Sequence, residues 1–417
     1  MTSDKSSSVF AYLACTLTLS LSCVLFACNK PASNPPAGAG ENAPGSVSEI
    51  ASGEADQILK QLKNTAAGQR SDLTWKYVEA LSRCTPKKQR AGGESIPALA
   101  KDSSVVSALL THLPQASVPQ QDIALFMLDE ISEQMPLPES CWPVVIEVIH
   151  KGDRRIRPPL IFTLECTAGL SKNGKLKAAL VNELSKEPDG DIRRLLAQSL
   201  GHVGDDDNSH IVFDALCRVI ANDPDERVRA AALGCVAANA KLKKNHAREV
   251  TQLVRGGFQS KSRVIRREAI MAAALFGDKS ATFVPDLIAV LGRPNETIGL
   301  GSTHTFAARS IGGIGPLAAS SVPALRKVLH EDGVTNEALI ALGAIGPAAG
   351  PAVPDIVSLA KDKDHTTSFI AIRTLGQLGI TAKSALPALK DMLATANKYD
   401  KLALKQAIDK IEAANQS

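Results

Sequence analysis

Three histidines are the residues of this sequence that most invite a metal or proton-transfer site. His304, His330 and His365 lie in the C-terminal third, and imidazole is the side chain that most often binds zinc or exchanges protons near neutral pH. They do not fall at equivalent positions of the repeat described below. Isolated histidines in loops are usually solvated, so we predict no metal site.

The short motifs of common catalytic and nucleotide sites are also missing. The sequence holds no G-x-S-x-G, H-E-x-x-H, Walker or G-x-G-x-x-G motif and no C-x-x-C pair, and each of these places groups that its chemistry needs. The nearest match, Gly312–Gly315, is explained below as a helix end. We therefore expect no catalytic residues, no cofactor and no enzymatic activity, and by default a binding surface.

Basic side chains supply the main candidate binding chemistry. The chain carries a net charge of only +4, yet residues 241–267 hold nine Lys or Arg against the single acid Glu249. Such a field attracts an acidic protein, anionic lipid headgroups or lipopolysaccharide phosphates. With arginines from the preceding repeats, the predicted surface consists of Arg193, Arg194, Arg229, Lys243, Lys244, Arg266 and Arg267.

Three of these arginines, Arg193, Arg229 and Arg266, belong to a repeated pattern of the form Asp/Ser-x-x-Ile/Val-Arg. It starts at Asp153, Asp189, Asp225 and Ser262, at steps of 36, 36 and 37 residues. Asp and Ser are residue types that cap the free N–H groups at a helix start, and helix-forming sequence rich in Ala and Leu follows each copy. The copy expected near Thr303 has no such cap.

Glycine and proline mark the other end of each unit. Apolar runs end at Gly315, Gly346 and Gly379, and a new apolar run opens about seven residues later with Val-Pro or Leu-Pro. Glycine suits a positive φ just past a helix C-terminus, and proline suits the first helical turn. Each unit is thus predicted to be two helices, which must stack on neighbours to bury their apolar faces.

The pattern resembles HEAT repeats, especially the short class similar to the repeats of phycobilin lyases. The segments DPDERVRAAALGCVA (Asp223–Ala237) and DGDIRRLLAQSLGHVGD (Asp189–Asp205) carry the resemblance. It implies an all-α fold, a right-handed α-solenoid of stacked helix pairs, with about seven units in residues 141–417. Residues 54–140 are expected to form degenerate N-terminal helical repeats or a cap.

The resemblance also bears on the arginines in two opposite ways. In HEAT-like proteins the second helix of each unit lines the concave face, so these side chains would form a basic track there. In such repeats, however, an arginine after the Ile/Val position often bonds the capping Asp of a neighbouring unit. That structural role is the competing interpretation of Arg193, Arg229 and Arg266.

The N-terminus predicts export and a membrane tether. Residues 9–27 carry no charge, and Leu25-Phe26-Ala27-Cys28 resembles a bacterial lipobox, in which the cysteine is acylated. We therefore assign residues 1–27 to a lipoprotein signal peptide, Cys28 to lipid attachment and residues 28–53 to a flexible linker. An uncleaved transmembrane helix or an ordinary cleaved signal peptide are the alternatives.

These observations predict a membrane-tethered scaffold in the bacterial cell envelope. Asn29, by similarity to a sorting rule of enterobacteria, favours the outer membrane facing the periplasm. We expect a protein partner, acidic if the basic surface binds it, and no nucleic acid, because aromatic residues make up only 4% of the chain. The alternatives are an enzyme-associated or lyase-like subunit, or a binder of anionic lipid or polysaccharide through residues 241–267. A disulfide between Cys217 and Cys235 is left open.

Overall fold

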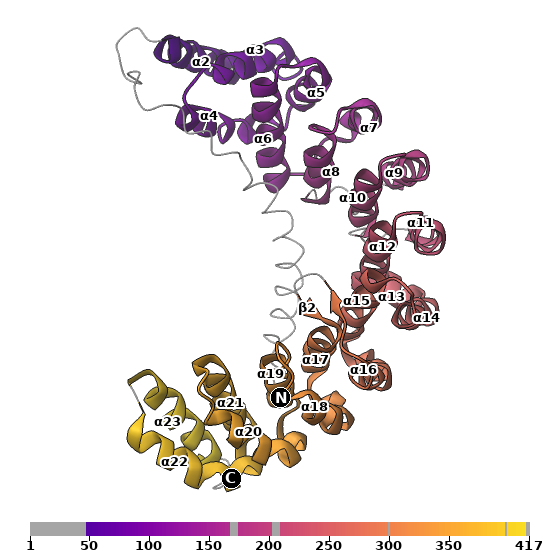
Figure 1. The fold of residues 1–417 in the computed structure, drawn as a ribbon. Coiled ribbons are helices and arrows are strands. Elements are labelled where there is room, and N and C mark those ends of the chain that lie inside the picture. Colours follow the sequence, from indigo (N-terminus) through magenta and orange to yellow (C-terminus); the bar gives the residue numbers. More distant parts are fainter. Residues whose placement is uncertain (1–46, 167–173, 202–208, 299–300, 397, 414–417) are drawn as a thin grey trace. The chain divides into compact units, whose positions relative to one another are not determined.

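The structure is a computed structural model that describes residues 47–166, 174–201, 209–298, 301–396 and 398–413. The chain divides after Ser46 into two units, and all of these residues belong to the second. They form an all-α solenoid of stacked helix pairs (Figure 1), which confirms the predicted fold class. The predicted signal peptide, Cys28 and most of the predicted linker lie outside the described residues.

Eight helix pairs, one more than expected, follow one another in the described part of residues 142–413. In each pair the first helix leads through a turn to a second helix, and every second helix packs on the second helix of the next pair. The pairs are α7 (Trp142–Lys151) with α8 (Arg157–Cys166), α9 (Gly174–Lys186) with α10 (Gly190–Gly201), α11 (Ser209–Asn222) with α12 (Glu226–Ala238), α14 (Ala247–Phe258) with α15 (Arg263–Ala272), α16 (Val284–Leu291) with α17 (Thr303–Ile314), α18 (Val322–Val328) with α19 (Thr335–Ile345), α20 (Val353–Ala360) with α21 (His365–Leu378) and α22 (Leu386–Thr395) with α23 (Lys398–Ala413).

The N-terminal region is helical and packs onto the first of these pairs. Helix α6 lies against α8, and α3 lies against α5 and α6. The elements are α2 (Val47–Asn64), α3 (Ser71–Ser82), α4 (Pro86–Gly93), η1 (Pro97–Leu99), α5 (Ser103–His112), η2 (Leu113–Gln115), α6 (Val118–Gln134) and η3 (Glu139–Cys141). Residues 47–53 belong to α2 and not to the linker, because Ala51 is small enough to bury in one helix face with Ala55 and Leu62.

The predicted caps begin the second helices. Asp225 accepts the N–H of Arg227 at 2.8 Å, and Asp153, Asp189 and Ser262 cap their helices in the same way. The expectation that the cap is lost near Thr303 was wrong: Ser302 accepts the N–H of Thr305 at 3.2 Å. A short antiparallel hairpin, β1 (Thr297–Ile298) and β2 (Gly301–Ser302), precedes α17 and displaces that cap from the expected spacing.

Glycine marks the junction between pairs, as predicted. Gly315, Gly346 and Gly379 have φ of 68°, 76° and 58°, and each opens a seven-residue 3₁₀ segment, respectively η5 (Gly315–Ser321), η6 (Gly346–Ala352) and η7 (Gly379–Ala385). Their ψ values near −135° lie outside the left-handed helical region and are essentially restricted to glycine. Gly277 in η4 (Ala273–Phe283), with φ 56°, is a fourth copy that the spacing did not reveal.

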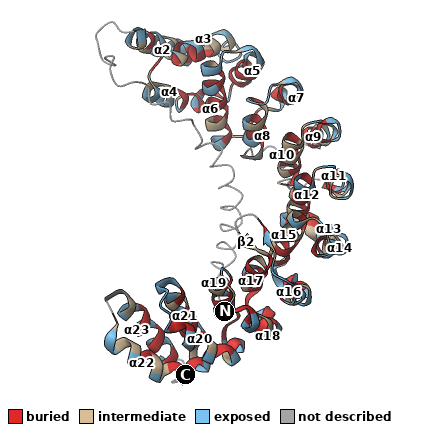
Figure 2. Ribbon diagram, in the orientation of Figure 1, coloured by how far each residue is buried: buried red, intermediate tan, exposed pale blue. Residues whose placement is uncertain are grey.

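Burial follows the stacking. Red, buried residues line the contacts between helices in Figure 2, while pale blue residues cover the faces turned away from them. The glycines of second helices allow close approach, because a Cβ on Gly312 would lie only 3.3 Å from the Ala341 Cα atom of the next second helix. The extra helix α13 (Ala240–Asn245) is inserted between α12 and α14.

One described stretch is long and apolar enough to cross a membrane by length and composition alone. It runs from Thr335 to Ala360, and half of it is buried inside the protein. The positive φ of Gly346 divides it into α19, η6 and α20, which pack within the stack. We interpret it as part of the core.

Candidate binding surface

The arginine of the repeat motif holds neighbouring pairs together. Arg193 lies in the first turn of α10 and donates through NH1 to the Glu187 and Pro188 carbonyls of its own turn. Its Nε and NH2 donate to the two carboxylate oxygens of Asp223, in the turn of the next pair, at 2.8 and 3.0 Å. The guanidinium thus joins two turns, which is the structural role that sequence analysis weighed against surface binding.

The acid in this contact is not the capping Asp but the residue two places before it. Asp223 also accepts the N–H of Asp225 at 2.9 Å, so one carboxylate serves the cap and the arginine. Arg157 with Glu187 repeats the arrangement. Arg266 also pairs with an acid of the next turn, Glu296, but that residue lies six places before the cap Ser302 because the hairpin intervenes. We call these inter-pair contacts the arginine ladder. The repeated sequence motif starts at the cap, so it does not include these acids, which precede the cap.

The ladder is interrupted at Arg229. Its NH1 donates to the Asp223 and Pro224 carbonyls, as the other arginines do to their own turns. Two places before the next cap, however, stands Ser260, whose hydroxyl accepts the N–H of Ser262 at 3.2 Å. A hydroxyl carries no charge, so this junction lacks the ion pair of its neighbours.

His304 takes the arginine's place one pair further on. Its side chain is buried, with 2% of the residue exposed, which corrects the expectation of a solvated loop histidine. One ring nitrogen lies 2.7 Å from Glu331 Oε2 of the next pair, and the other lies 2.9 Å from the Arg293 carbonyl of its own turn. His330 and His365 are exposed, as expected. The described residues contain no cluster with metal-ligand geometry.

The seven predicted surface residues do not form one basic track among the described helices. Arg193 and Arg266 belong to the ladder, Arg229 bonds carbonyls of its own turn, and Arg194 donates to Gln198 at 3.2 Å. Lys243 reaches the Leu275 carbonyl and lies 5.4 Å from the ring centre of Phe276, and burial lowers its pKa. Lys244 is exposed and Arg267 is partly exposed. Binding by this set therefore stays a prediction, and most of its charges already have acceptors.

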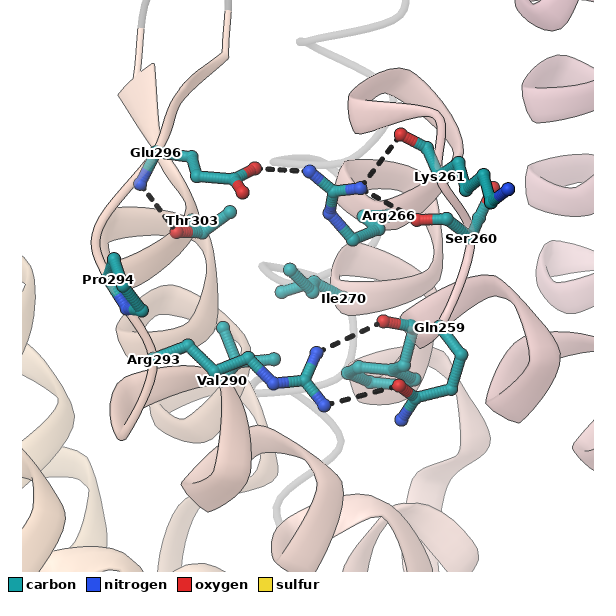
Figure 3. Close-up of a pocket in the computed structure, with 11 residues that line it drawn as sticks. Gln259, Ser260, Lys261, Arg266, Ile270, Val290, Arg293, Pro294, Glu296 and Thr303 are labelled. Carbon is teal, nitrogen blue, oxygen red and sulfur yellow. Dashed lines mark hydrogen bonds and ion pairs between the residues drawn. The ribbon is translucent and has the colours of Figure 1, made fainter.

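A pocket of about 370 Å³ lies at the Arg266 junction. Figure 3 shows two polar bridges across it: Arg266 reaches Glu296, and Arg293 reaches the Phe258 carbonyl at 3.4 Å and Gln259 at 3.2 Å. Ile270 lies between the bridges. Because these polar groups bond one another across the gap, we interpret the pocket as a space between two pairs and assign no ligand to it.

A different surface, missed by sequence analysis, runs over α17, α19 and α21. Arg309, Ile340 and Arg373 each stand six residues before the junction glycine of their pair, so they occupy one position on three neighbouring second helices. Ile340 is 53% exposed, and Phe369, one turn before Arg373, is 41% exposed. Exposed apolar groups gathered in this way are typical of interaction sites. The spacing from the glycines was the signal that could have found them.

Cysteine chemistry plays no part in this surface. Cys217 on α11 and Cys235 on α12 are not joined by a disulfide, and neither Cys84 nor Cys141, the other cysteines whose side chains are described, forms one. The disulfide that the sequence left open is therefore not formed in this structure.

Comparisons with known proteins agree with the fold. A family model described as HEAT repeats matches residues 322–409. The structure of YibA from Escherichia coli superposes with a TM-score of 0.51 and 19% identity, over 71% of this chain and 97% of YibA. Yeast importin-β, Kap95p, gives a TM-score of 0.58 and 13% identity, over 88% of this chain and 56% of the importin.

These likenesses show the fold alone, and the chain spans about half the length of the importin. A further solved structure with the same scores is a complex of Kap95p with Nup1. No curated protein matches this chain. The finer resemblance to the repeats of phycobilin lyases stays a prediction.

Proposed function

We propose that this protein is a non-catalytic protein-binding scaffold, tethered to a membrane of the bacterial cell envelope by a lipid on Cys28. The observation that carries the binding role is the exposure of Ile340 and Phe369 on neighbouring second helices, whose other faces are used for stacking. A solenoid leaves such a face open along its length, because each unit contacts only its neighbours.

The comparison structures support a binding role at the level of the fold. Kap95p was solved with Nup1 and with RanGDP, so a stack of this kind accommodates protein partners. Extending that role to this chain is our inference, since 13% identity carries no specific partner with it.

The tether rests on sequence. The uncharged residues 9–27, the lipobox ending at Cys28 and a following segment poor in large apolar residues are the pattern of an exported lipoprotein. We place the protein in the envelope, at the outer membrane facing the periplasm.

The tether is tested with the full chain and its Cys28→Ala variant in a bacterial host. Acylation predicts that the native protein sediments with membranes and carries a lipid mass on residue 28, whereas the variant is unprocessed or released. An intact N-terminal segment in both proteins, with equal membrane partition, would show that the lipobox is accidental and would remove the lipoprotein part of the proposal.

The binding role is tested in the same cells by site-specific photo-crosslinking. A photoreactive residue at Ile340 should capture one defined envelope protein, identified by mass spectrometry, and the same residue at exposed Lys327 on the first helix α18 should not. A scaffold role would be contradicted if the probe at Ile340 captured no protein, or no more than the probe at Lys327, and if probes on the other second helices gave the same result.

A further inference from the structure

We propose that α17, α19 and α21 form a docking face for a protein segment that presents carboxylates beside large apolar side chains. The inference rests on the proposed scaffold function and names its site and the chemistry of its partner. We define the docking face by Phe306, Arg309, Glu337, Ile340, Phe369 and Arg373.

The row across these helices is continuous. Arg309, Ile340 and Arg373 share one repeat position, and the helices that carry them are in direct contact, α17 with α19 and α19 with α21. Small residues bring the helices close: Gly312 lies against Ala341, and Gly343 lies against the Gln377 side chain. The axes of helices in contact are about 8–10 Å apart. The exposed side chain of Ile340 therefore lies between Arg309 on one neighbouring helix and Arg373 on the other.

Each arginine is positioned by an aromatic ring of its own helix. The guanidinium carbon of Arg309 lies 5.9 Å from the Phe306 ring centre, and that of Arg373 lies 5.9 Å from the Phe369 ring centre. A guanidinium over a ring keeps its planar N–H edge available for a carboxylate, which it binds through two parallel hydrogen bonds. The rings also restrict the side-chain rotamers, so less entropy is lost on binding.

The charge of the face selects the partner. Among residues 303–314, 335–345 and 365–378 the formal charges are Arg309, Glu337 and Arg373. Arg309 donates to Glu337 at 3.2 Å, while the interactions described for Arg373 include no carboxylate. The face is therefore apolar with one uncompensated positive charge, and its complement is an apolar segment with at least one carboxylate.

Two other occupants fit less well. Residues 28–46 of this chain contain no Val, Leu, Ile, Met or aromatic residue, so they cannot cover Ile340 and Phe369 with apolar groups. A second copy, related by a two-fold axis through Ile340, would bring Arg309 opposite Arg373 and set like charges together. A separate protein with acidic and apolar side chains meets both requirements.

The test uses a display library of random twelve-residue peptides, selected on the full chain in detergent and, in parallel, on Ile340→Asp and Arg373→Glu variants. Enriched peptides should place Asp or Glu within three residues of Leu, Ile or Phe. Their affinity should fall by about tenfold or more for either variant and stay unchanged for Lys327→Glu, a control on α18. Reversing the peptide's acid to Lys should restore binding to Arg373→Glu.

Other outcomes would overturn the docking face. Peptides without acidic residues, binding unaffected by both substitutions, or no enrichment would each do so, as would dimerisation by light scattering that Ile340→Asp abolishes. Circular dichroism should show that the variants remain folded, since both positions are exposed. If a partner crosslinks to probes on other second helices but not to probes on the docking face, the docking face is rejected and the scaffold function is retained.

Discussion

Arg193 donates to both carboxylate oxygens of Asp223, thirty residues later in the chain, at 2.8 and 3.0 Å. Only 13% and 5% of the two side chains are exposed, so this ion pair is shielded from water and salt. The backbone carbonyl of Asp223 also accepts a hydrogen bond from Arg229 of its own turn. One acidic residue thus connects its own turn to the turn of the preceding pair.

We expect Arg193→Met to lower the free energy of unfolding by about 2–3 kcal/mol, because it leaves the buried Asp223 carboxylate without its cation. Arg229→Met is the matched control. It loses hydrogen bonds to carbonyls but no ion pair, and should cost about 1 kcal/mol. Urea unfolding of both variants measures the difference. Equal losses would mean that the ladder acts through packing of the arginine stems alone.

The interrupted junction offers the converse experiment. Ser260→Asp places a carboxylate two places before the next cap, as Glu187 and Asp223 are. It lies 31 residues after Arg229, one more than the 30 residues that separate Asp223 from Arg193. We expect a gain of up to about 1 kcal/mol in unfolding free energy. The gain should vanish in the Arg229→Met background, where the new carboxylate has no arginine. A gain that persists there would point to helix capping instead.

The sequence predicted the elements that depend on local chemistry and missed those that depend on contacts between units. Asp225 as a cap and Gly346 at a helix end follow from backbone requirements that few residue types satisfy. His304 was missed because the hairpin before α17 moves its cap to Ser302 and hides the shared position. The row of Arg309, Ile340 and Arg373 was missed because no residue type repeats along it.

Glu268 provides a pH-dependent test of packing between second helices. Its side chain lies against Gly234 of the preceding second helix, and burial raises its pKa, which nearby Arg267 partly offsets. The native state therefore binds this proton more tightly than the unfolded chain does, and the contribution of Glu268 to stability falls as pH rises above the unfolded value. Glu268→Gln removes the ionisation.

We therefore expect Glu268→Gln to match the native protein in thermal stability near pH 4 and to exceed it at pH 8. The difference at pH 8 should be about 1–2 °C or more in Tm for a chain of this length. Calorimetric scans at several pH values give the measurement. A difference that is constant across pH would show that the shape of the side chain, and not the ionisation of Glu268, decides the effect.

The basic residues 241–267 predict weak binding to anionic lipid membranes. Lys243 and Arg266 have acceptors inside the protein, whereas Lys244, Arg248 and Lys261 are exposed. Reversing these three to Glu should leave the unfolding free energy nearly unchanged and reduce any cosedimentation with phosphatidylglycerol vesicles at low salt. Vesicles of phosphatidylcholine are the control. Undiminished binding to the anionic vesicles would exclude residues 241–267 as a site for anionic lipid.

Alanine substitutions at glycines show whether a glycine is needed for its backbone conformation or for lack of space around it. A Cβ on Gly346 would have no atom within 4 Å, yet its φ is 76°. Gly346→Ala should therefore cost about 1–2 kcal/mol through strain alone. Gly256 in α14 also has open space around it, but without a positive φ, so Gly256→Ala should stabilise the protein by about 0.5–1 kcal/mol. Urea midpoints that move in the same direction for both variants would mean that the turn at Gly346 relaxes to a negative φ, and that glycine there is not required for the stacking of α19 and α20.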